Sequence, residues 1–132
     1  MRVLGIDPGY ERLGVAVLER IEHKETVLFS TCVQTDKHEA LPDRLWQLGQ
    51  AVEKLLKTHR PTHVALETLF FNQNQKTGIA VAQARGVVIY AARQAGLTVC
   101  EYGPQEVKTA VTGYGKSDKL AVVSMVKKLA IG

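Results

Sequence analysis

The fold is decided by the first hairpin of the chain, residues 3–18, which read VLGIDPGYERLGVAVL. Residues 3–6 form a short continuous apolar run, which is typical of a strand buried on both faces of a sheet. Asp7-Pro8-Gly9-Tyr10 is a turn signal, and residues 13–18 predict a second strand. Residues 26–33 are rich in β-branched and aromatic side chains and predict a third strand, so the chain is expected to begin with an antiparallel meander.

After the meander the apolar pattern changes to a helical period. Pro42 stands at the expected start of a helix, and Pro61 lies past its end. The apolar residues that fall on one face between them are Leu45, Leu48, Val52, Leu55 and Leu56. A strand at residues 63–66, ending in Glu67, is predicted to follow.

The rest of the chain alternates helices with one more strand. Residues 75–95 predict a helix that is small or apolar nearly all round, which must be covered on more than one side. Residues 97–102 predict a fifth strand, and two shorter helices are expected at residues 104–111 and 117–129. The order βββαβαβαα predicts one α/β domain over residues 1–132, with a mixed five-stranded sheet. Three antiparallel strands are expected first, then parallel strands, with helices on both faces, as in the ribonuclease H-like fold.

Composition excludes several classes of protein. Of the 132 residues 45% are hydrophobic and 23% charged, as in an ordinary globular protein, and the apolar runs are too short to cross a bilayer. No signal peptide is expected, which favours the cytoplasm and no membrane. Cys32 and Cys100 lie in apolar, strand-like stretches without metal-ligand spacing, so reduced core thiols are expected. The net charge of +4 permits a polyanionic partner without requiring one.

Two carboxylates each follow a predicted strand, and these two strands are candidates for lying side by side in the sheet. Asp7 follows the first buried strand and Glu67 follows the fourth. If those strands are parallel and adjacent, both acids emerge at the same edge of the sheet, where such sheets place their ligands. Hard oxygen ligands suit Mg²⁺ or Mn²⁺. The alternative is that Asp7 belongs to an Asx turn and Glu67 to a surface loop, and spacing alone leaves both interpretations open.

Three blocks of sequence resemble the RuvC-type Holliday junction resolvases, in the same order and over essentially the whole chain. The blocks are LGIDPG with LGVAV (residues 4–9 and 13–17), ALETLFFN with AQARG (65–72 and 82–86), and EYGPQEVK with GYGKSDK (101–108 and 113–119). The resemblance implies a homodimeric endonuclease that binds four-way junction DNA during recombination and repair and makes two symmetric nicks. It also implies two Mg²⁺ ions per active site, with Mn²⁺ as a substitute, and a branch-migration helicase complex as a partner.

The resemblance also implies roles for single residues. Asp7 and Glu67 match metal-binding catalytic acids, and Phe70 matches an aromatic residue that stacks on a base at the junction centre. Lys108 and Lys119 match basic residues near the scissile phosphate. Lys116 and Lys119 flank Ser117, a candidate helix cap. Taken alone, such a charge cluster is typical of a solvated turn, whereas the resemblance favours phosphate binding at a helix N-terminus.

The end of the sequence departs from the family pattern. The resemblance places two further metal ligands, mostly acidic, on a later helix with an Asp-Ala-x-Asp-like pattern, and no residue before Gly132 can be assigned that role. We therefore expect a C-terminally incomplete nuclease domain that binds junctions but cuts them poorly. A non-catalytic junction-binding module is the first competing function.

Two more competing functions belong to proteins that share the first hairpin. One is that of a resolvase-like nuclease acting on ribosomal RNA precursors, and the second is that of an actin-like sugar kinase, of which the chain would be a fragment. A kinase of that kind needs two such domains around its nucleotide.

The apolar helix at residues 75–95 favours a dimer of this chain, with Val88 and Ile89 as candidate contacts.

Overall fold

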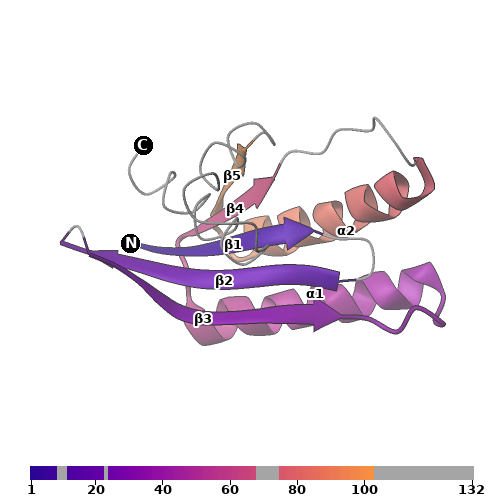
Figure 1. Ribbon diagram of the computed structural model, residues 1–132, viewed down its shortest axis with the longest axis horizontal. Helices are drawn as coiled ribbons and strands as arrows, with labels where there is room; N and C mark the ends of the chain where they lie inside the picture. The colour runs from indigo at the N-terminus through magenta and orange to yellow at the C-terminus, as the bar shows by residue number, and fades with distance from the viewer. Residues whose placement is uncertain (9–11, 23, 68–74, 103–132) are drawn as a thin grey trace, which may run out of the picture.

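The computed structural model describes residues 1–8, 12–22, 24–67 and 75–102. Within them a five-stranded sheet, in the order β3-β2-β1-β4-β5, is covered on one face by two helices (Figure 1). The elements are β1 (Arg2–Pro8), β2 (Arg12–Ile21), β3 (Lys24–Gln34), α1 (Leu41–His59), β4 (His63–Glu67), α2 (Gln75–Gln94) and β5 (Thr98–Tyr102). β1, β2 and β3 pair antiparallel, whereas β4 pairs parallel with both β1 and β5. The predicted mixed sheet is confirmed.

The strands of the meander are longer than their apolar runs. β1 pairs with β2 along its whole length, and its last residue, Pro8, stands opposite Leu13. Asp7 and Pro8 are therefore strand residues, and the prediction of a turn beginning at Asp7 is wrong. Pairing with a neighbouring strand extends β1 beyond the point where its own sequence ceases to be apolar.

Both faces of the central strands are buried. Leu4 and Ile6 are fully buried against the helices, in one cluster with side chains of β2, β4, α1 and α2. The opposite face is buried as well, at Val3, Ala16, Leu18 and Ala65. This confirms the prediction from the continuous apolar run. The two described helices share one face, and the helices predicted at residues 104–111 and 117–129 lie outside the described residues.

α1 begins and ends at the expected signals. Pro42 lies in its first turn, and Arg60 closes it in the left-handed conformation, with a φ of 48° and a backbone N–H that donates to the carbonyl oxygen of Leu56 at 2.9 Å. Arg2 then ties the end of α1 to the sheet. Its guanidinium donates to the carbonyl oxygen of His59 and to Glu19 Oε2, the shortest contact with the carboxylate being 2.6 Å.

α2 packs closely because its inward residues are small. Ala84, Val88, Ala91 and Ala92 are buried against the sheet. Val88 therefore belongs to the core of its own chain and cannot make the dimer contact considered from the sequence. The outward stripe of α2 remains exposed at Ile79, Gln83, Gly86 and Tyr90. Neither helix described is long and apolar enough to cross a lipid bilayer.

Gly49 of α1 lies against Val87 of α2, and little room is left there for a side chain. A Cβ atom added there would stand 3.1 Å from Val87 Cγ1. Gly49→Leu is expected to lower the free energy of unfolding by about 1–3 kcal/mol, because the larger side chain forces the helices apart. Urea denaturation measures the change. Gln50→Leu, at the exposed neighbouring position, is the control, and equal losses in both variants would contradict the explanation.

β3 forms one edge of the sheet, and its side chains are largely exposed. Val27, Leu28, Phe29 and Cys32 all lie in this exposed part. The expectation that Cys32 is a core thiol is wrong, because an apolar strand pattern does not distinguish an edge strand from a central one. Cys100, on β5, is half-buried. Both thiols are free.

Candidate active site

Asp7 and Glu67 stand at the same edge of the sheet, on neighbouring parallel strands. Ile6 of β1 is opposite Leu66 of β4, and both side chains are fully buried. Asp7 and Glu67 are the next residues of the two strands, and Glu67 is opposite Tyr102 of β5. This is the placement expected from the sequence. The metal-binding role of the two acids stays a prediction.

Asp7 is half-buried on the face of the sheet that points away from α1 and α2. It alternates with Ile6, which faces the helices, and its partner across the hairpin is Gly14. A Cβ atom at Gly14 would stand 3.6 Å from Asp7 Cβ, within van der Waals contact. Because glycine has no side chain, the flank of Asp7 stays open on this side. Sequence reasoning overlooked Gly14, although counting outward from the turn would have paired it with Asp7.

The donor set fits a divalent cation. Neighbouring strands lie about 4.8 Å apart, so two carboxylates at the carboxyl ends of adjacent strands repel each other unless a cation lies between them. Mg²⁺ is commonly held by one or two carboxylates, with waters and substrate phosphates completing its shell. Among the described side chains, which do not include that of Glu67, no group of three His, Cys, Asp or Glu converges. The candidate protein ligands predicted from the sequence are Asp7 and Glu67, and this assignment stays a prediction.

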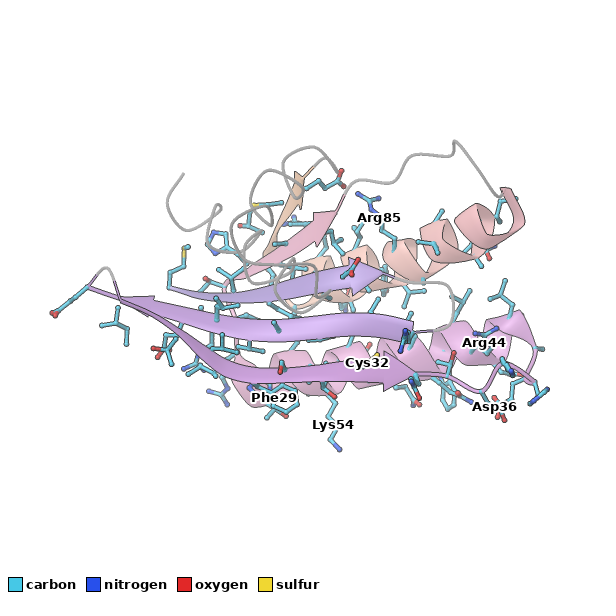
Figure 2. The ribbon with its side chains drawn as sticks, viewed as in Figure 1. Phe29, Cys32, Asp36, Arg44, Lys54 and Arg85 are labelled. Carbon is cyan, nitrogen blue, oxygen red and sulfur yellow. The ribbon has the colours of Figure 1, made fainter. Side chains whose placement is uncertain are left out.

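An ion pair lies beside this edge of the sheet. Arg85 of α2 places Nη2 2.5 Å from Oε1 of Glu101, which is the residue of β5 before Tyr102. Figure 2 shows Arg85 near the carboxyl end of β4. Sequence reasoning had placed Arg85 in a motif without giving it a role. Its partner lies on a different element, so the spacing of residues in the sequence could not indicate the pair.

A pocket elsewhere on the molecule does not include the acids. It is a partly open hollow at the start of α1, and its apolar wall includes the core residues Leu13, Leu48 and Ala84. Arg12 and Arg44 also line it, and Arg44 donates from Nε to Thr35 Oγ1 at 3.1 Å. Because this pocket lies on the helix-bearing side of the sheet and Asp7 faces the other way, it is not the candidate catalytic centre.

Four of the predicted site residues lie outside the described residues. They are Phe70, Lys108, Lys116 and Lys119. Their roles in DNA binding stay predictions.

Comparison with known proteins decides the family. The family model described as crossover junction endodeoxyribonuclease RuvC matches residues 3–131. This chain belongs to the RuvC family. A RuvC of Desulfitobacterium hafniense is 45% identical over 129 residues, which cover 98% of this chain and 78% of the relative. The RuvC family is one of metal-dependent nucleases.

Solved RuvC structures agree with the fold. T. thermophilus RuvC in complex with a Holliday junction substrate superimposes with a TM-score of 0.83 and 27% identity, covering 100% of this chain and 96% of that one. A second Thermus thermophilus RuvC structure gives a TM-score of 0.75 and 35% identity, covering 97% and 79%. Membership of the RuvC family sets aside the ribosomal-RNA-processing nuclease and the sugar kinase as families for this chain.

Proposed function

We propose that this protein is a structure-selective endonuclease that resolves four-way DNA junctions by hydrolysing phosphodiester bonds, in homologous recombination and DNA repair. The observation that carries the proposal is the position of Asp7 and Glu67, one residue past the buried Ile6–Leu66 pair of adjacent parallel strands. Its RuvC relatives are bacterial and are named crossover junction endodeoxyribonucleases, and one similar RuvC was solved with a junction substrate. The bacterial cytoplasm is the expected site of action.

In this proposal the chain's own residues hold and orient the reacting groups. Asp7 and Glu67 bind Mg²⁺, or Mn²⁺ in its place, and two ions per active site are expected. A divalent cation there would stabilise the negative charge that develops on the phosphate in the transition state. Lys108 and Lys119 contact phosphates near the scissile bond and Lys116 contacts the backbone further away, while Phe70 stacks on a base at the junction centre.

The direct test is a nicking assay with a synthetic four-way junction. We expect slow cleavage with Mg²⁺ or Mn²⁺, none in EDTA, and still less cleavage of a linear duplex of the same sequence. A structured RNA of similar size serves as the competing substrate. Tight junction binding without nicking in either metal would identify a junction-binding module instead. Equal cleavage of duplex and junction would overturn the proposed selectivity.

The lysines that contact phosphates should contribute to the salt dependence of junction binding. Each phosphate contact releases counterions, so Lys108→Ala, Lys116→Ala and Lys119→Ala are each expected to reduce the slope of log K against log salt by about one unit. Fluorescence anisotropy of a labelled junction measures the slopes. Lys54→Ala is the matched control, because Lys54 is exposed on α1, away from the sheet edge of Asp7 (Figure 2). Unchanged slopes in all three variants would return these lysines to a solvated turn.

A homodimer through α2 belongs to the same proposal. Ile79, Gln83, Gly86 and Tyr90 recur at helical spacing and form one exposed stripe, in which Ile79 is 55% and Tyr90 69% exposed. Apart from the backbone of α2 itself, no atom of the described residues lies within 4 Å of a Cβ atom added at Gly86, so a second helix has room to approach there. A two-fold axis through this stripe would present two active sites to a junction. A branch-migration helicase complex is the further partner that we expect from the family.

A further inference from the structure

One ion pair fixes the end of β5 against α2. Arg85 Nη2 and Glu101 Oε1 are 2.5 Å apart, with the Arg85 side chain 17% exposed and that of Glu101 45% exposed. The arginine is thus largely shielded from water, while the carboxylate keeps one side in solvent. Because the donors of a guanidinium lie in one plane, this ion pair restricts the relative orientation of the two side chains as well as the distance between them.

The pair lies one step along the sheet from the candidate metal ligands. Glu101 is opposite Leu66, which is opposite Ile6, so these three residues form one row across β5, β4 and β1. The following row contains Tyr102 and Glu67, and Asp7 follows Ile6 in β1. Glu101 therefore lies in the row of paired residues immediately before the acids.

Near Arg85, apolar packing between α2 and the sheet does little to fix the orientation of the helix. Three of the four buried α2 side chains, Val88, Ala91 and Ala92, lie on the C-terminal side of Arg85. On its N-terminal side only Ala84 is buried among the described side chains. A single methyl group makes a short contact that tolerates sliding and rotation. The ion pair provides the directional contact that the alanine does not.

We propose that Arg85 and Glu101 are positioning residues for the metal site. Their ion pair holds the end of β5, and through β5 the end of β4, at the spacing from β1 that lets Asp7 and Glu67 hold one divalent cation. This inference rests on the proposed function of those two acids. Residues that orient metal ligands without touching the metal commonly change metal affinity or activity by about 10–100-fold when they are replaced.

The test is Mn²⁺ binding by the protein without DNA, measured by electron paramagnetic resonance of the free ion. Glu101→Gln and Arg85→Gln are each expected to weaken Mn²⁺ binding by about 10-fold. The Mg²⁺ concentration for half-maximal nicking should rise by a similar factor. Junction affinity in EDTA should stay unchanged, because neither residue is assigned to the DNA. Arg85→Glu combined with Glu101→Arg should restore much of the Mn²⁺ affinity.

The Arg2–Glu19 pair supplies a matched control. It has a similar separation of 2.6 Å, and its side chains are 33% and 25% exposed, but it joins the amino end of β1 to β2, remote from the acids. Glu19→Gln should lower the urea midpoint without changing Mn²⁺ affinity. A purely structural role for Arg85 and Glu101 would produce the same result as Glu19→Gln.

The outcomes separate this inference from the function on which it rests. Unchanged Mn²⁺ binding in Asp7→Asn would overturn the proposed metal site itself. If Asp7→Asn abolishes binding while Glu101→Gln and Arg85→Gln bind Mn²⁺ like the unmodified protein, only the positioning role is wrong. Should either glutamine variant fail to fold, the charge-swapped pair and the conservative Arg85→Lys variant decide the question. Full Mn²⁺ affinity in Arg85→Lys, together with no Mn²⁺ affinity regained in the charge-swapped pair, would also overturn the positioning role.

Discussion

Replacing Asp7 by asparagine is expected to abolish nicking of a four-way junction while leaving junction binding intact. Asparagine preserves the size of the side chain and removes the charge that attracts the cation. Loss of a cation that stabilises the transition state by about 4 kcal/mol corresponds to roughly a thousandfold slower cleavage. Junction affinity is expected to stay equal or to increase, because removing a carboxylate lowers the repulsion of phosphates. Glu67→Gln should behave in the same way.

Single-turnover cleavage of a labelled junction and anisotropy binding in EDTA measure the two effects separately. Mn²⁺ titration in parallel reports on the site even under conditions where cleavage is slow. The control is Asp36→Asn, since Asp36 is exposed in the turn before α1 and its Oδ1 accepts from the backbone N–H of His38 at 2.9 Å, a bond that asparagine can also accept (Figure 2). Cleavage by Asp7→Asn at the rate of the Asp36→Asn control would remove Asp7 from the site.

Placing aspartates on the exposed stripe of α2 is the second large change. Ile79→Asp combined with Tyr90→Asp is expected to weaken the dimer by at least a hundredfold. Two apolar anchors are lost, each worth about 2 kcal/mol when it lies at the centre of an interface, and like charges meet across the two-fold axis. Sedimentation velocity at micromolar concentration should show a dimer for the unmodified protein and a monomer for the double variant.

A cruciform plasmid connects this change to function. Two nicks within one encounter produce linear DNA, whereas a single nick produces an open circle, so the double variant should shift the product from linear to open circle. Trp46→Asp is the control, because Trp46 is 64% exposed on α1 and lies outside the stripe. A monomer in the unmodified protein would contradict the dimer, and a dimer in the double variant would place the interface elsewhere.

Much of the fold could be predicted from local pattern. The run at residues 3–6 indicated burial on both faces, and the structure buries Leu4 and Ile6 on one side and Val3 on the other. The proline signals around α1 were confirmed because a proline acts on the backbone next to it, whatever the rest of the chain does. The exposure of Cys32 was not predictable, because it depends on β3 being an edge strand, which is a property of the whole sheet.

The candidate site likewise contains residues that could be predicted from the sequence and residues that could not. Asp7 and Glu67 could be found because each lies at the carboxyl end of its own strand, and the parallel pairing of β1 with β4 brings the two ends together. The Arg85–Glu101 pair could not, because it depends on how α2 is rotated about its axis relative to β5. The same rotation decides that Val88 is buried and Tyr90 exposed on a helix whose sequence is apolar nearly all round.

The sheet order also has a consequence for folding kinetics. β1, β2 and β3 are joined by short turns, so their pairing can form early, whereas pairing of β1 with β4 closes a loop of about 60 residues. Because the two acids belong to β1 and β4, high metal affinity should appear only in this later step. A divalent cation in the buffer should then slow unfolding of the complete sheet. The rate at which the meander forms should not change, because the cation binds only after the long loop has closed.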